Sequence, residues 1–106
     1  MIYNKLVRDK IPEIIEEQGK KVNYHILNQE EFIEALKDKL IEEAKELKEA
    51  KTTEEIVEEL VDVLEVYHIF METSDISSET IYEAGFNKLE KKGGFYKKIF
   101  LESVEE

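Results

Sequence analysis

Two helix-starting motifs, 24 residues apart, constrain the fold of this chain more than any other feature. Each motif places a capping residue three positions before a glutamate, and the two pairs are Asn28 with Glu31 and Thr52 with Glu55. In such a capping box both side chains accept backbone N–H groups that the start of a helix leaves unpaired. Apolar residues recur at helical spacing to about Ala50 after the first motif and to about Glu72 after the second. The sequence therefore predicts two long, consecutive helices joined by a tight turn.

Shorter elements are expected on either side of these helices. A short helix over residues 12–18 begins at Pro12, whose fixed backbone angle suits a first helical turn. Ser77 or Ser78 caps a further helix that ends at Gly93-Gly94.

Two segments have the pattern of β-strands. Apolar and polar residues alternate from Lys21 to Leu27, and residues 95–101 are rich in aromatic and β-branched side chains. These two segments could pair with each other. The whole pattern predicts a single all-α domain over residues 1–106. We expect a helical bundle built on a long antiparallel helix hairpin, with short strands near its two ends.

Composition indicates a globular chain that associates with itself. Hydrophobic residues make up 42% of the 106 residues, which is too many for a disordered tail. A chain of this size buries a limited core, and amphipathic helices often complete that core by oligomerising. We therefore expect a homodimer or a homotetramer. The absence of cysteine excludes a disulfide framework, a thiolate metal site and a cysteine nucleophile.

The charge of the chain is strongly negative and unevenly distributed. A net charge of −11 argues against a nucleic-acid partner, because such proteins usually carry a basic surface. Residues 28–83 hold 18 acidic residues and 5 lysines, whereas residues 1–27 and 84–106 each hold 5 basic and 4 acidic residues. An acidic middle with basic ends suits a site for a metal ion and phosphates. A solvated acidic surface is the alternative.

The N-terminal residues are not expected to act as a targeting segment. Charged residues such as Lys5 and Arg8 interrupt them, so they lack the apolar core of a signal peptide. No apolar run approaches the roughly 18 residues that span a bilayer. We expect a soluble, cytoplasmic protein with no membrane partner.

The first long helix carries two carboxylates where apolar residues are expected. Its apolar stripe consists of Phe32, Ile33, Leu36, Leu40, Ala44 and Leu47. At about 100° per residue, Glu43 falls inside this stripe and Glu46 falls at its edge. A buried carboxylate must be paired, protonated or bound to a cation, because burying it bare costs several kcal/mol.

The second long helix repeats the anomaly. Its expected stripe consists of Ile56, Leu60, Val63, Leu64, Tyr67, Phe70 and Met71. Glu59 falls beside Phe70, with Asp62 next to it three residues on. The hairpin can bring the two acidic pairs together, and four converging carboxylates form an all-oxygen site that suits Mg²⁺ or Mn²⁺. A salt-bridge network with Lys39 or Lys45 is the alternative.

The acidic residues also form a motif that resembles a known family. E-E-A-K-E at residues 42–46 and E-L-V-D at residues 59–62 resemble the E-E-x-x-E…E-x-x-D signature of the all-α nucleoside triphosphate pyrophosphohydrolases, the MazG-like superfamily. The opening segment Tyr3–Ile15 and the closing segment Lys91–Leu101 are similar to a subgroup labelled phosphoribosyl-ATP pyrophosphohydrolase-like. The resemblance covers essentially the whole chain.

This resemblance implies a reaction and a set of site residues. By position, the metal ligands of the family correspond to Glu43, Glu46, Glu59 and Asp62. Glu42 would support these ligands or help to position the attacking water, so all five acids are candidate catalytic residues. The family cleaves a (d)NTP between its α and β phosphates, giving a (d)NMP and pyrophosphate. Its members bind Mg²⁺ and usually assemble as dimers or tetramers.

Basic residues are candidates for binding the phosphates of a nucleotide substrate. Arg8 can hold a phosphate through two hydrogen bonds, whereas a lysine acts as a point charge. The candidates are Lys5, Arg8, Lys10, Lys39, Lys88, Lys91 and Lys92. Each lysine could instead be a solubilising surface charge. Asp9 could pair with Arg8 or cap the helix that begins at Pro12.

Two other functions stay open at this point. Tyr67 followed by His68 is also similar to the phosphoribosyl-ATP pyrophosphohydrolases of histidine biosynthesis, although the N-terminal R-D-K-I-P segment is not expected of that enzyme. The second long helix is apolar nearly all round, with Val57, Val61 and Ile69 outside its stripe. A non-catalytic helical oligomer that acts as a scaffold is therefore the other alternative.

Overall fold

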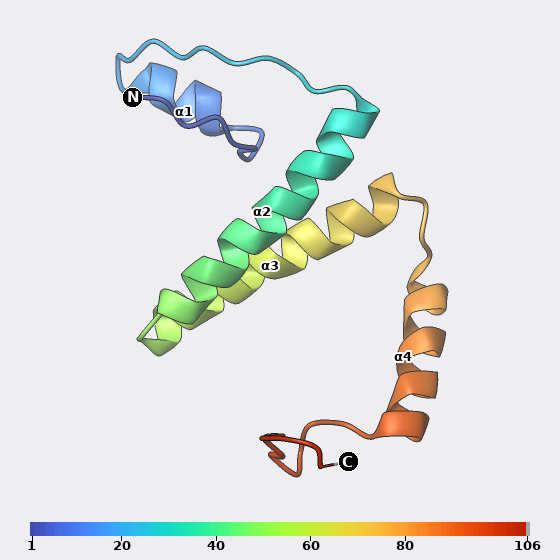
Figure 1. Ribbon diagram of the computed structural model, residues 1–106. Helices are drawn as coiled ribbons and strands as arrows, with labels where there is room; N and C mark the ends of the chain where they lie inside the picture. The colour runs from blue at the N-terminus through green and yellow to red at the C-terminus, as the bar shows by residue number, and fades with distance from the viewer. Residues whose placement is uncertain (106) are drawn as a thin grey trace. The chain divides into compact units, whose positions relative to one another are not determined.

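The computed structural model describes residues 1–105. In that range the chain forms four helices and no strand, which confirms the all-α class. The helices are α1 (Ile11–Glu17), α2 (Gln29–Glu49), α3 (Thr53–Thr73) and α4 (Ser78–Lys92) (Figure 1). Over these residues the backbone divides into two compact units, the first Met1–Asp75 and the second beginning at Ile76. None of the helices described is both long and apolar enough to cross a membrane.

Both expected capping boxes are present at the starts of α2 and α3. The Glu31 N–H donates to Asn28 Oδ1 over 2.9 Å, and the Asn28 N–H donates to Glu31 Oε1 over 3.1 Å. Thr52 and Glu55 exchange the equivalent bonds, 3.1 Å to Thr52 Oγ1 and 2.9 Å to Glu55 Oε1. The two helix starts predicted from the sequence are therefore confirmed.

The shorter helices begin and end close to the predicted residues. α1 has proline in its first turn and lies one residue earlier than expected. Ser77 caps α4 by accepting the Thr80 N–H. Gly93 ends α4 with a φ of 79°, a left-handed conformation that glycine adopts without strain.

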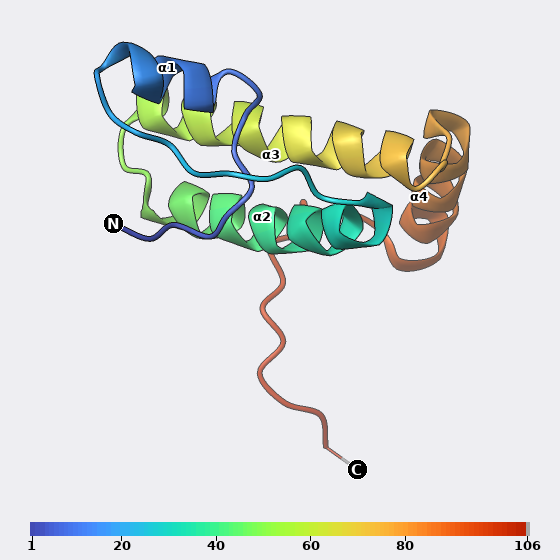
Figure 2. The ribbon, with the colours of Figure 1, turned by 90° about the horizontal axis from the view of Figure 1, so that it is seen from above.

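α2 and α3 form the packed centre of the first unit. Residues Ala50–Thr52 join them, and the two helices lie side by side in both views (Figures 1 and 2). The buried apolar side chains among residues 1–105 are Leu36, Val66 and Met71, which are 2%, 8% and 8% exposed. The N-terminal segment runs past both helices (Figure 2) and forms ion pairs with them. This packing brings the carboxylate pairs of α2 and α3 into one region.

The two predicted strands are wrong. Residues 21–27 have no regular secondary structure, and residues 95–101 contain a bend and a turn but no strand. A strand needs a neighbour for its ladder of hydrogen bonds, and an isolated two-stranded pair is marginal in water. Tyr24 and Ile26 stay 65% and 86% exposed, so the first segment buries little apolar surface. Alternation of polar and apolar residues is not enough to make a strand here.

The burial of α3 follows its predicted apolar stripe only in part, since Met71 is buried and Val63 and Phe70 are half-buried. Leu60 and Leu64 lie at the centre of the expected stripe but are 49% and 54% exposed, whereas Val66 is buried. Because α3 is apolar nearly all round, its hydrophobic pattern does not single out one face. The face nearest α2 also carries Glu59 and Asp62, which lie close to the α2 carboxylates. The predicted stripe is therefore wrong at its centre.

Replacing Thr52 by alanine should lower the free energy of unfolding by about 1 kcal/mol, because the start of α3 loses the oxygen that accepts the Glu55 N–H. Urea unfolding followed by circular dichroism measures this change. Thr53→Ala is the matched control, since Thr53 is the first residue of α3 and makes no side-chain hydrogen bond within the described residues. Equal losses in the two variants would contradict a role for the capping box.

Candidate metal centre

Two pairs of carboxylates meet between α2 and α3. Glu43 and Glu46 lie about one turn apart on α2, as Glu59 and Asp62 do on α3. Glu43 lies six residues before the end of α2 and Glu59 six residues after the start of α3, so both are equally far from the link. One oxygen from each of the four side chains lies within 4.8 Å of the other three. The structure thus brings together the four acids singled out from the sequence, and we name them the acidic cluster.

Glu43 is the most buried member of the acidic cluster, with 4% of the residue exposed. Burial, and then the neighbouring Glu46 carboxylate, raise the pKa of Glu43 from 4.5 to about 7, although Lys39 opposes the change. A protonated Glu43 can donate a hydrogen bond to Glu46, whereas two ionised carboxylates repel each other. Near neutral pH this side chain must therefore keep a proton for part of the time or receive a cation.

Glu59 has a related environment on α3. Loss of solvation raises the pKa of Glu59, and the nearby Glu46 and Asp62 act in the same direction. Glu43 Oε2 and Glu59 Oε2 are buried and have no hydrogen-bond partner within residues 1–105. Leaving a buried acceptor unsatisfied costs free energy, so each of these oxygens needs a hydrogen-bond donor, a proton or a cation. Both belong to the acidic cluster, which a single ligand can therefore serve.

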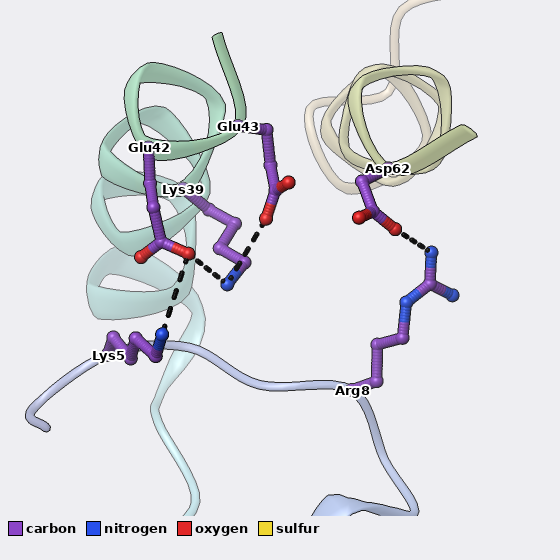
Figure 3. A network of polar contacts seen from close by, with 6 residues as sticks. All are labelled: Lys5, Arg8, Lys39, Glu42, Glu43 and Asp62. Carbon is purple, nitrogen blue, oxygen red and sulfur yellow. Dashed lines mark hydrogen bonds and ion pairs between the residues drawn. The ribbon is translucent and has the colours of Figure 1, made fainter. Parts of the chain in front are cut away.

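Two basic side chains neutralise part of the acidic cluster (Figure 3). Arg8 Nη2 donates to Asp62 Oδ1 over 2.8 Å, and this hydrogen bond raises the pKa of Arg8. Lys39 Nζ lies 2.7 Å from Glu42 Oε2 and 3.4 Å from Glu43 Oε1. Partial burial lowers the pKa of Lys39, but its contacts with Glu42 and Glu43 outweigh this effect and raise it. The salt-bridge alternative is thus present in part.

The residues that remain fit a divalent cation. Arg8 and Lys39 bring two positive charges to four carboxylates, and Lys45 makes no ion pair in the part of the chain described. Oxygen ligands at about 2.1 Å from Mg²⁺ lie roughly 3–4 Å from one another, close to the spacing in the acidic cluster. Carboxylate oxygens are also the donors that Mg²⁺ and Mn²⁺ prefer. The two unpaired oxygens can become ligands without breaking an existing bond.

An open hollow of about 540 Å³ borders the acidic cluster, and its lining is almost entirely acidic. Ala50 and six glutamates form it, namely Glu46, Glu49, Glu54, Glu55, Glu58 and Glu59. Such a wall repels phosphate groups. The side on which Arg8 and Lys39 meet the cluster is the one suited to a phosphate-bearing substrate.

The other predicted site residues lie outside the acidic cluster. Glu42 contacts Lys39 at 2.7 Å and Lys5 at 3.8 Å. Lys10 directly precedes α1 and forms no ion pair among the residues described. The predicted lysines of the second unit lie on α4 and are Lys88, Lys91 and Lys92. Their role in phosphate binding stays a prediction.

The contact between Arg8 and Asp62 is the part of the site that sequence reasoning missed. Arg8 pairs with Asp62 rather than with Asp9, and α1 has no side-chain cap, so both roles suggested for Asp9 are wrong. The partners lie 54 residues apart, a separation that no local pattern reveals. One signal was available, because Arg8 is the only arginine beside 14 lysines and a guanidinium suits a carboxylate partner.

Comparisons with protein-family models, with curated proteins and with solved structures found no match. The resemblance to the MazG-like superfamily therefore stays a prediction. It is carried by the two acidic motifs and by the segments at both ends of the chain.

Burial of Glu43 predicts that the stability of the metal-free protein depends on pH. The pKa of Glu43 is about 7 in the folded state against an ordinary value of 4.5, so between these values the folded state binds more protons than the unfolded state. The free energy of unfolding should therefore fall as the pH rises from about 5.5 to about 8, by roughly 1–3 kcal/mol. Urea unfolding in the presence of EDTA at both pH values measures the difference.

Glu43→Gln should reduce this pH dependence, because an amide is uncharged at both pH values. Glu49→Gln is the matched control, since Glu49 is an exposed glutamate of the same helix and its loss should leave the dependence in place. If the parent protein is equally stable at both pH values, ionisation of Glu43 does not destabilise the fold and the prediction is wrong.

Proposed function

We propose that this protein is a Mg²⁺-dependent nucleoside triphosphate pyrophosphohydrolase, with Mn²⁺ as an alternative cation. It would cleave a (d)NTP between the α and β phosphates, giving a (d)NMP and pyrophosphate. The observation that carries the proposal is the meeting of four carboxylates from two helices, with buried, unpaired oxygens on Glu43 and Glu59. The resemblance of the two acidic motifs to the MazG-like signature supports the choice of reaction.

The side chains around the cluster have different roles in this proposal. The metal ion is held by Glu43, Glu46, Glu59 and Asp62. When bound, it supplies positive charge to phosphate oxygens and lowers the pKa of an attacking water. Glu42 helps to position that water and holds Lys39 at 2.7 Å. Lys39 and Arg8 stabilise the negative charge that develops on the phosphates.

The proposal extends to the scaffold and to the location of the protein. We propose that α2 and α3 form the long antiparallel hairpin expected from the sequence pattern. Their three-residue link and their packing against each other support this arrangement. We propose the cytoplasm as the place of action, because the substrate would be a free nucleotide.

Pyrophosphate release from a panel of substrates tests the reaction. The panel contains ribo- and deoxyribonucleoside triphosphates and phosphoribosyl-ATP, each assayed with and without Mg²⁺. Glu59→Gln should lower kcat/KM by at least about tenfold, because one metal ligand loses its charge. Glu58→Gln is the matched control, since this adjacent glutamate is not part of the acidic cluster and should leave the activity unchanged.

The results separate the three candidate functions. Preference for phosphoribosyl-ATP would assign the protein to the biosynthetic alternative. Equal activity in the parent and Glu59→Gln would remove the proposed mechanism. Absence of both activity and a saturable heat of Mg²⁺ binding would support a non-catalytic helical scaffold.

An exposed apolar face on α3 supports self-association. This α3 apolar face consists of six side chains that are 36–54% exposed, namely Ile56, Val57, Leu60, Val61, Leu64 and Tyr67. They fall on one side of α3 in an arc that holds no Asp, Glu, Lys or Arg. A contiguous exposed apolar surface of this kind is typical of an interface. We propose that the α3 apolar face packs against a second copy of the chain in a homodimer or a homotetramer.

Leu60→Lys should weaken this association by at least about tenfold, because it buries an unpaired charge at the centre of the interface. Size-exclusion chromatography with light scattering, run over a range of concentrations, measures the mass. Glu72→Lys is the control, since it adds a positive charge near the C-terminal end of α3, beyond the six residues of the α3 apolar face. A parent protein that stays monomeric at the highest concentration would contradict the proposed interface.

A further inference from the structure

Arg8 is hydrogen-bonded to one of the four carboxylates of the acidic cluster. Its Nη2 lies 2.8 Å from Oδ1 of Asp62, one of the four carboxylates that meet between α2 and α3. A guanidinium and a divalent cation on the same carboxylate would lie within a few ångströms of each other, and like charges at that separation repel strongly. A metal ion bound to Asp62 should therefore weaken the hydrogen bond between Asp62 and Arg8.

The ion pair is also the shorter of the two described ion pairs that join the N-terminal segment to the helices. The other described ion pair of this segment joins Lys5 Nζ to Glu42 Oε2 over 3.8 Å, near the outer limit for such a pair. Residues 1–10 contain no helix or strand of their own. The Arg8 and Asp62 side chains are 55% and 33% exposed, and an ion pair as well solvated as this is weak enough to exchange for a stronger partner.

We propose that Arg8 and a divalent cation compete for Asp62, so that metal binding releases Arg8 and loosens the N-terminal segment from α2 and α3. This inference rests on the metal site of the proposed function. Without metal, Arg8 is an internal counter-ion for the acidic cluster. Once released, its guanidinium stays tethered near the cluster and can bind phosphate oxygens through two parallel hydrogen bonds. Arg8 would thus have a role both in the metal-free protein and in the metal-bound protein.

The single arginine makes this exchange directly observable. Because Arg8 is the only arginine in the sequence, a ¹H–¹⁵N spectrum of the labelled protein contains one arginine Nε–Hε signal, which needs no further assignment. Titration with magnesium chloride should move this signal towards the position of a free arginine side chain. The movement should follow the saturation of Mg²⁺ binding measured by calorimetry on the same sample.

The Mg²⁺ affinity of two variants provides an independent measurement. Arg8→Gln should bind Mg²⁺ about two- to fivefold more tightly than the parent, because a competitor for Asp62 has been removed. Lys20→Gln removes the same charge from the first unit, at a residue with no ion pair among residues 1–105, and should bind Mg²⁺ as the parent does.

Each outcome decides the inference. Saturable Mg²⁺ binding that leaves the Arg8 signal in place would overturn the competition and leave the proposed metal site standing. Absence of Mg²⁺ binding would overturn both. Unchanged or weaker affinity in Arg8→Gln would also contradict the competition, whereas tighter binding together with a mobile Arg8 signal would establish it.

Discussion

Repulsion among the four carboxylates between α2 and α3 is the interaction that explains the other charged contacts of the first unit. Two unit charges about 4 Å apart interact by roughly 1 kcal/mol in water and by several times more where solvent is excluded. The structure reduces this repulsion in two visible ways: burial favours the protonated form of Glu43, and Arg8 and Lys39 supply positive charge. Arg8, together with Lys5, also joins the irregular N-terminal segment to the helices. The proposed cation would neutralise the remaining negative charge and contact the two buried oxygens that have no hydrogen-bond partner within the described residues.

Local signals in the sequence predicted the parts of the fold that depend on local hydrogen bonds. The capping boxes at Asn28 and Thr52 need only four consecutive residues, so the starts of α2 and α3 could be read directly. The acidic cluster could be predicted for a related reason. Its members repeat every three residues on helices joined by a short link, so their approach follows from helical geometry once the helices are known.

Features that depend on distant partners could not be predicted in this way. Residues 21–27 alternate as a strand does, yet no neighbouring strand pairs with them within the described chain. α3 is apolar on most sides, so its pattern did not reveal that Val66 rather than Leu60 is buried. The bond between Arg8 and Asp62 joins residues 54 positions apart. In each case the deciding partner lies far along the chain.

The turn between α2 and α3 has a consequence for how such a chain can vary. Glu43 and Glu59 oppose each other because each lies six residues from the end of its helix that adjoins the link Ala50–Thr52. An extra residue in a helix beside this turn would shift one acidic pair by about 1.5 Å and rotate it by about 100°. Insertions there would separate the carboxylates even if every acid were retained. The irregular stretch between α1 and α2 has no such role in spacing, so its length can change while the cluster stays intact.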